Sequence, residues 1–418
     1  MPSQNNSDTT ARPEPAALLT KLLSLQIPCD WQFCSYRLQS VEKVLAYFFN
    51  HVLSGNTLRM TAFEIERLEG RNISHGTLHN NFSKLEPVLL AQINSILQTR
   101  QRTTYRRVAQ DSSILSEHKL KINVLYDIDD GTCVSIKIAP KTVSDSKMEC
   151  ELVGEHRIIS DAGYCYAKSI NMHINQGHHL IYNCTLHNIA LYHPTEDIRV
   201  EESHIEEMIL GKDFIDFDVR CGMSSKSSKS KDNGCIFGHK LRLIGVKTTE
   251  EHAQRRLEKI KKAAKKDKRE LRAVTIALSE WIFLITNLPR EEYPVMRLFN
   301  TYKARWSVER WFWRAKHILK FDELRSKKDQ MKKLILLCKI LIALLWEDER
   351  PTIVCSKESP RVLSDHNFWL LCKSVWTEEL RKGVLPQVGW GATFDWLRYA
   401  SASHVQSSTA MHLVNSGC

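Results

Sequence analysis

Between residues 16 and 104 the apolar positions recur with the period of α-helices. Apolar side chains of the first clear helix fall on one face: Val41, Val44, Leu45, Phe48 and Val52. Thr61 with Glu64 indicates a capping box for a short helix that runs through Leu68. Ser74 can cap a further helix after a turn at residues 69–72. The segment therefore has the outline of a helix-turn-helix.

The helix that follows Ser74 offers side chains able to hydrogen-bond to base edges or phosphates. They are His75, Thr77, His79, Asn80, Asn81 and Lys84. Many helical bundles contain the same kind of turn, so a purely structural bundle is the alternative to a DNA-binding domain.

From residue 105 the apolar pattern takes the period of β-strands. Three strand-like runs come first, at 107–115, 119–128 and 133–139, and Asp129, Asp130 and Gly131 form a hairpin turn between the last two. A helical patch at 143–153, a strand at 157–161, a helix at 166–175 and a strand at 179–184 follow. Three antiparallel strands followed by alternating helices and strands are the order of the RNase H-like α/β fold.

Residues 197–275 have the pattern of an insertion into this fold. Strands are predicted at 214–219 and 236–244, joined by a polar loop at 224–234. A basic helix follows, with ten Lys or Arg against four Asp or Glu in residues 251–272. A solvated helix is the alternative to a nucleic-acid contact.

Composition adds a partner class to this outline. The 418 residues are 43% hydrophobic and carry a formal charge of +11, which favours a polyanion without separating DNA from RNA or a membrane surface. The first residues lack the pattern of a secretory signal, and the apolar run at 334–346 is too short to span a bilayer, so it is predicted as a buried helix. The 12 cysteines include no CxxC pair, as in reduced thiols of an intracellular protein.

The chemistry concentrates in residues 301–316, which the pattern predicts as one helix. On such a helix Tyr302, Arg305, Glu309 and Lys316 share a narrow stripe beside an apolar face. A carboxylate flanked by two cations and a phenol suits a metal-bound phosphodiester, because the acid binds Mg²⁺ while the other groups hold phosphate oxygens.

This spacing resembles the Y-xx-R-xxx-E-xxxxxx-K signature of DDE transposases of bacterial insertion sequences, the IS-four family. The resemblance extends to the strand at 281–289 and covers roughly residues 105 to 345. It implies that Asp111, Asp161 and Glu309 are the catalytic acids and that they bind two Mg²⁺, with Mn²⁺ able to substitute. Asp127, Asp129 and Asp130 are rival acids, but they lie at a hairpin turn where acids are common.

The resemblance has one departure and one further candidate. Family members often carry Arg after the second aspartate, where this chain has Ala162. Trp281 occupies the position of a Trp that stacks on a flipped base, with a core Trp as the alternative. The histidines His173, His178, His179, His187 and His193 lack regular ligand spacing, and incidental placement is preferred to a zinc site.

We therefore expect a cut-and-paste DNA transposase that binds its terminal inverted repeats as a homodimer on double-stranded DNA, in the bacterial cytoplasm at the nucleoid and without a membrane. The alternatives are an RNase H-like nuclease or integrase and a catalytically silent, transposase-derived DNA-binding protein. The predicted segments are a disordered 1–15, a helical DNA-end-binding domain at 16–104, an RNase H-like core at 105–196 and 276–350, a β insertion domain at 197–275, and a helical region with possible dimer contacts at 351–418.

Overall fold

The computed structural model describes residues 41–70, 72–101, 104–148, 152–222, 236–268, 270–354 and 364–382. The predictions for residues 1–15 and for the loop at 224–234 lie outside these ranges. The chain divides into two compact units: Leu97–Phe312 is one, and Met1–Ile96 with Trp313–Cys418 is the other.

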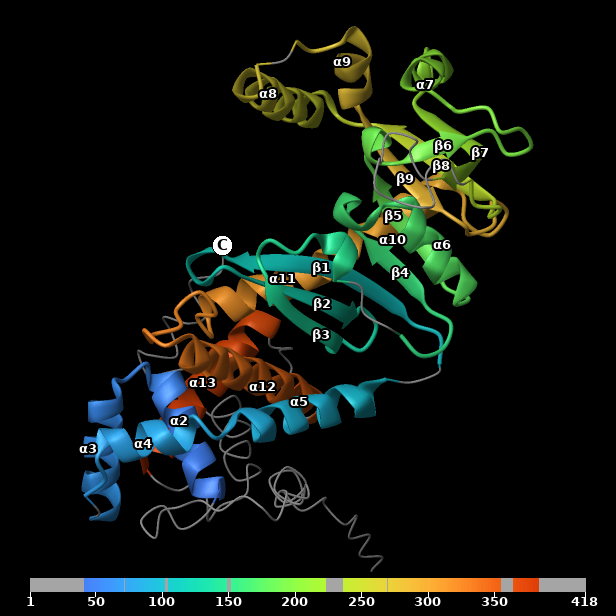
Figure 1. Ribbon diagram of the computed structural model, residues 1–418. Coiled ribbons are helices and arrows are strands. Elements are labelled where there is room, and N and C mark those ends of the chain that lie inside the picture. The colour runs from blue at the N-terminus through green and yellow to red at the C-terminus, as the bar shows by residue number, and fades with distance from the viewer. Residues whose placement is uncertain are drawn as a thin grey trace, which may run out of the picture. The chain divides into compact units, whose positions relative to one another are not determined.

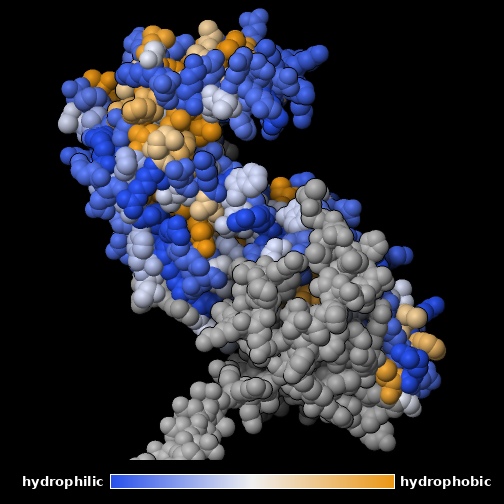
Figure 2. Space-filling view, turned by 180° about the vertical axis from the view of Figure 1, so that it is seen from behind, coloured by the Kyte–Doolittle hydropathy of each residue, from blue (hydrophilic) through white to orange (hydrophobic). Residues whose placement is uncertain are grey.

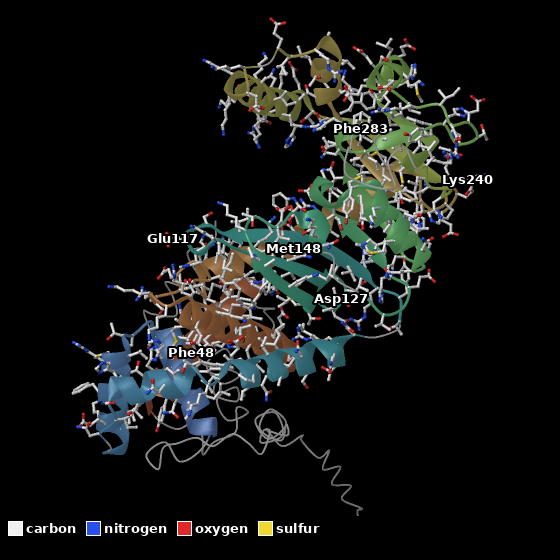
Figure 3. All side chains as sticks on the ribbon, in the orientation of Figure 1. Phe48, Glu117, Asp127, Met148, Lys240 and Phe283 are labelled. Carbon is white, nitrogen blue, oxygen red and sulfur yellow. The ribbon has the colours of Figure 1, made fainter. Side chains whose placement is uncertain are left out.

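The second of these units is helical. Its helices are α2 (Val41–Ser54), α3 (Leu58–Glu69), α4 (His75–Phe82), α5 (Glu86–Arg100), α12 (Asp329–Val354) and α13 (Asp365–Lys382), with α5 continuing into the other unit (Figure 1). On the predicted face of α2, Val44 and Phe48 (labelled in Figure 3) are fully buried and Leu45 and Val52 are partly buried. The ring of Phe48 lies 4.8 Å from that of Phe82. Helix α2 also contacts α12 and α13, so elements from both ends of the sequence share this core.

The helix-turn-helix outline is present, with one correction. Thr57, not Thr61, caps α3 by accepting the Met60 amide, and Thr61 lies buried inside the helix, where its hydroxyl donates to the Thr57 carbonyl. Ser74 caps α4 as predicted. Gly70 ends α3 in the left-handed conformation at φ 66°, which glycine adopts without strain.

The apolar run at 334–346 is a buried part of α12, as predicted. Trp369 and Trp376 of α13 pack edge-on against Trp346, with ring centroids 5.7 Å apart in both pairs. Both side chains are buried within their own unit, and the dimer contact predicted for residues 351–418 stays a prediction. Among the described helices, none has the length and apolarity needed to cross a membrane.

The other unit is built on a nine-stranded sheet of order β3-β2-β1-β4-β5-β9-β8-β7-β6 (Figure 1). The strands are β1 (Arg107–Leu115), β2 (Leu120–Asp127), β3 (Thr132–Pro140), β4 (Arg157–Ser160), β5 (His179–Cys184), β6 (Ala190–Tyr192), β7 (Phe214–Gly222), β8 (Leu241–Lys247) and β9 (Trp281–Thr286). Strands β1, β2 and β3 are antiparallel, while β4 is parallel to β1 and β5 is parallel to β4. The predicted strand order of the core is therefore present.

Alternating residues of the central strands supply two cores. Ile158 packs on one face with residues of α6 (Ala167–Asn175), α7 (Glu202–Ile209) and α9 (Ala273–Ser279). Its neighbour Ile159 packs on the opposite face with Leu298 of α10 (Val295–Lys303). The parity of a strand residue therefore determines whether its side chain lies on the face of the sheet that α10 covers.

Residues 197–275 extend the same sheet. Strand β7 pairs with β8, and β8 pairs with β9, which in turn pairs with β5. Strand β8 begins at Leu241, later than the predicted start at residue 236, and helix α8 (Glu250–Lys266) follows it (Figure 1). Between residues 143 and 153 the described part contains only a 3₁₀ turn, η2 (Asp145–Lys147), in place of the predicted helical patch. The division into core and insertion domain stays a prediction.

Candidate active site

Asp111 and Asp161 come from neighbouring parallel strands. Gln110 of β1 is in register with Ser160 of β4, so Asp111 and Asp161 follow at matching positions, where strands are about 4.8 Å apart. Both have the parity of Ile159, whose side chain faces α10. The first two acids therefore lie side by side on the sheet face that α10 covers.

The predicted helix at 301–316 is in fact two helices. Helix α10 ends at Lys303 and α11 (Trp306–His317) begins after Arg305. Between them the amides of Ala304 and Arg305 bond to carbonyls three residues back rather than four, which tightens the chain into a 3₁₀-like turn. Tyr302 thus belongs to α10, and Glu309 and Lys316 belong to α11.

Arg305 lies at this break and joins two of the predicted acids. One terminal nitrogen, Nη1, lies 3.5 Å from Oδ2 of Asp111, and Nη2 donates to Oε1 of Glu309. The Asp111 contact spans 194 residues of sequence. The side chains of Asp111 and Arg305 are 20% and 11% exposed. Three predicted site residues are therefore brought together at a partly buried point.

Burial raises the pKa of Asp111 to about 6. Arg305 and the backbone amide of Ser112, 2.8 Å from Oδ1, act in the opposite direction, while Asp161 and Glu309 add to the increase through like-charge repulsion. Asp161 is held by the Ala162 amide at 2.7 Å, so residue 162 supports the acid through its backbone although it has no side chain to reach a phosphate.

Replacing Asp111 with Asn is expected to stabilise the metal-free protein at pH 8. The carboxyl has a pKa of about 6 in the folded chain and an ordinary value of 3.8. Between these two pH values, folding is therefore accompanied by uptake of a proton at Asp111. Above pH 6 the carboxyl is ionised in the folded chain, and its burial there lowers the free energy of unfolding. Asn removes this cost but also the Arg305 contact, so we expect a gain of about 1–2 kcal/mol.

Urea denaturation in EDTA at pH 8 and pH 5 measures this effect. The advantage of the Asp111→Asn variant should shrink at pH 5, where the wild-type carboxyl is protonated. Asp213→Asn, at an exposed position, is the matched control and should be neutral at both pH values. A variant that is less stable than wild type at pH 8 would contradict the assignment.

The ring of Tyr302 packs against the Arg305 guanidinium. This ring packs beside the core of Ile159, Leu284 and Leu298, and the Arg305 guanidinium lies 5.7 Å from the ring centroid. Burial is the main cause that raises the pKa of Tyr302 to about 12, so the hydroxyl stays protonated and can donate to an anion.

The rival acids are committed elsewhere. Asp127 is fully buried against Arg106, and Asp130 lies 3.2 Å from the same guanidinium. Asp129 pairs with Arg107. Figure 3 labels Asp127 at the end of β2. These acids connect the hairpin to the start of β1. They are not part of the group formed by Arg305, Asp111 and Glu309, here called the Arg305 cluster.

Two further residues, Trp281 and Lys316, were predicted to contact DNA. Trp281 is 3% exposed and packs with Phe283, their ring centroids 6.3 Å apart, so the structure favours the core alternative over a ring free to stack on a base. Lys316 lies in the last turn of α11 and belongs to the other compact unit. Its contact with a phosphate stays a prediction.

A supporting residue was missed by sequence reasoning. Asp145 accepts hydrogen bonds from the Ser112 hydroxyl at 2.6 Å and from Lys121 at 3.1 Å, and so orders the strand residue that follows Asp111. No motif marks Asp145, because its role depends on a 3₁₀ turn folding back on β1 and β2. Among the histidines, the buried rings of His173 and His178 lie 5.6 Å apart, and His156 lies 5.8 Å from His178.

The acids suit a hard divalent cation by type. Carboxylate oxygens are the donors that Mg²⁺ prefers, and mutual repulsion at Asp111 is what a cation would relieve. As the described residues stand, however, no three His, Cys, Asp or Glu side chains are placed to hold one metal ion. The cation that contacts Asp111 and Glu309 here is the Arg305 guanidinium.

Part of this chain is similar in sequence to known proteins. Residues 98–346 match the family described as transposase DDE domain. Over 107 residues the chain is 30% identical to the transposase for insertion sequence element IS421 of Escherichia coli and, equally, to the InsL protein of IS186A of Escherichia coli strain K12; the match covers 26% of this chain and 29% of each relative.

A piggyBac transposase solved as a synaptic complex with hairpin DNA aligns with a TM-score of 0.44 and 8% identity, over 94% of this chain and 84% of that one. A score of this size does not establish a common fold. The family match, in contrast, extends over more than half of the chain and includes Asp111, Asp161 and Glu309. The chain belongs to the transposase DDE domain family and is an insertion-sequence DDE transposase by descent.

Proposed function

We propose that this chain is a cut-and-paste DNA transposase, which binds the terminal inverted repeats of its insertion sequence and catalyses metal-dependent strand cleavage and transfer into target DNA. The observation that carries the proposal is the Arg305 cluster. It gathers Asp111 from the first strand and Glu309 from the second half of the domain at one partly exposed point, with Asp161 in register beside Asp111.

Each group in the cluster has a role toward a phosphodiester. Asp111, Asp161 and Glu309 would hold Mg²⁺, which when bound activates the attacking oxygen and stabilises the leaving one. Arg305 would donate to nonbridging phosphate oxygens through its planar fork, and Tyr302 would donate a hydrogen bond from its protonated hydroxyl. Lys316, on α11 with Glu309, would add a positive charge to the DNA contact.

The surrounding elements fit the same activity. The order β3-β2-β1-β4-β5, with β4 and β5 parallel to β1, supports an RNase H-like core. The capped helices α3 and α4 would read the terminal repeats. Two ends must be handled together, so we infer a homodimeric synaptic complex.

Cleavage of DNA that bears the element's ends tests the proposal. The intact protein should nick or cut such ends in Mg²⁺, and the Glu309→Gln protein should not. Equal cleavage by both proteins, or none by the intact protein with correct ends, would contradict it. Inverted repeats flanking the gene would separate a transposase from a nuclease or integrase of the same fold.

The exposed lysines of α8 support binding of a DNA duplex by this helix. Its exposed residues include Lys259, Lys261, Lys262 and Lys265, while Leu257 and Ile260 are partly buried. On the coloured part of the face that Figure 2 shows, hydrophilic residues prevail and separate apolar patches interrupt them.

Replacing Lys261, Lys262 and Lys265 together with Ala is expected to weaken end binding about tenfold or more at low salt. It should also reduce the slope of log affinity against log salt by about 2, because fewer counterions are released. Fluorescence anisotropy on an end duplex across a salt series measures both. Ala at the exposed Lys119, Lys137 and Lys141 is the charge-matched control. Equal losses in the two triple variants would show a general charge effect and remove α8 from the binding surface.

A further inference from the structure

Arg305 holds the oxygens that a metal ion would need. Its Nη1 lies 3.5 Å from Oδ2 of Asp111, and its Nη2 donates to Oε1 of Glu309. One guanidinium thus forms ion pairs with two of the three acids, and no three acids as they stand are placed to hold one metal among the described residues. Guanidinium and metal therefore require the same carboxylate oxygens.

The freedom of Arg305 to leave the carboxylates lies in its side chain. Its backbone is held in the tight turn between α10 and α11, where its amide donates to the Tyr302 carbonyl and its carbonyl accepts from the Val308 amide. Its Nε is buried and has no hydrogen-bond partner among the described residues. Besides the carboxylates, the guanidinium rests on the face of the Tyr302 ring, a contact that tolerates sliding.

We propose that Arg305 is an internal counter-ion of the metal-free site. It occupies Asp111 and Glu309 until a divalent cation binds, and the cation displaces it. The released guanidinium then faces the position of the phosphate, so that metal loading and the grip on the scissile strand are coupled. This inference rests on the proposed function, because it takes Asp111 and Glu309 to be metal ligands.

The opposite arrangement makes an opposite prediction. If Arg305 served as a permanent brace that holds the acids in position for the metal, its removal would weaken metal binding. If it competes with the metal, its removal abolishes two ion pairs that wild type must break, and metal binding tightens. The sign of one affinity change separates the two.

Binding of Mn²⁺ alone, without DNA, to the full chain tests the proposal by electron paramagnetic resonance of the free ion. Arg305→Met keeps the length of the apolar stem over Tyr302 and removes the charge. We expect its Mn²⁺ affinity to exceed that of wild type by about tenfold. Its metal-free form should melt at a lower temperature than wild type, and saturating Mn²⁺ should raise that temperature by more than it raises that of wild type.

The matched control is Arg310→Met, at an exposed position on α11 where the Arg310 guanidinium donates to the Ser307 hydroxyl at 3.4 Å. It removes the same charge from the region, and we expect a change below about threefold, the size of a screened surface charge effect. Arg305→Lys retains a charge that cannot bridge two carboxylates as a planar fork does, so its affinity should lie between wild type and Arg305→Met. It also serves if Arg305→Met does not fold.

Affinities of the Arg305 variants that are unchanged, weaker, or no tighter than that of Arg310→Met would overturn the inference. A Glu309→Gln variant distinguishes this failure from failure of the proposed function. If Glu309→Gln loses Mn²⁺ binding while Arg305→Met gains none, the metal site stands and the counter-ion role falls. If Glu309→Gln binds Mn²⁺ as wild type does, the metal-site assignment itself falls.

Discussion

The Glu309→Gln protein is expected to cleave transposon ends at least about a thousandfold more slowly than wild type in Mg²⁺, a loss on the order of 4 kcal/mol in transition-state stabilisation. Gln keeps the volume of the side chain and one carbonyl oxygen but loses the charge that would bind a divalent cation. The side chain is 37% exposed and reaches Arg305 from the first turn of α11, so the change alters few packing contacts.

Single-turnover cleavage of a labelled end duplex measures this loss, and anisotropy on the same duplex shows whether binding survives. Glu291→Gln, at an exposed position before α10, is the matched control and should cleave at the wild-type rate. Loss of cleavage with intact DNA binding and an unchanged melting temperature would support a role in chemistry. A Glu309→Gln protein that cleaves within tenfold of wild type would rule that role out.

Acid is expected to destabilise the protein between pH 6.5 and pH 4. Burial lowers the pKa of His51, His173 and His178 to about 4 in each case, against an ordinary value of 6.5. The unfolded chain takes up protons on these rings as the pH falls below 6.5, while the folded chain does not. The stability they contribute is therefore complete above pH 6.5 and is lost as the pH falls toward 4, by up to about 3 kcal/mol for one fully shifted ring.

Urea denaturation at pH 7.5, 6.0 and 5.0 measures the slope. His173→Leu replaces a ring that is 3% exposed in the β-sheet unit, and it should flatten the pH dependence. His187→Leu, at an exposed position, is the control and should leave the slope unchanged. If His173→Leu and wild type lose stability in parallel over this range, His173 does not carry the effect.

The local elements could be predicted because local chemistry specifies them. The Asp129–Gly131 turn separates β2 from β3 as expected, with Gly131 at φ 71°, and the Asp161 carboxylate follows a buried strand. Two local predictions were wrong for local reasons. Thr57 and Thr61 are both followed by residues that can form the first turn of a helix. Thr57 is the N-cap because α3 begins at Leu58, before Thr61. The break between α10 and α11 contains no Gly or Pro, so the spacing of apolar residues predicted one continuous helix across it.

The candidate site also combines features that the local sequence predicts with features that it does not. The spacing of Tyr302, Arg305 and Glu309 predicted a stripe on one helix, and these residues do meet, although across a break that the periodicity did not reveal. The preference for Asp111 over Asp127 came from family resemblance. In the tertiary structure Arg106 pairs with Asp127 in the core, whereas Asp111 pairs with Arg305, and the catalytic role of Asp111 stays a prediction.

By itself, the sequence determined the order along the chain and the type of the central strands and predicted the candidate site residues, because strand parity, turn residues and motif spacing are properties of short segments. Only the tertiary structure decided three things. Trp281 lies in the core, Asp145 orders Ser112, and Arg305 rather than open space lies between Asp111 and Glu309. Each depends on contacts between segments far apart in the chain, whose free energies are set by burial and charge pairing and leave no periodic mark in the sequence.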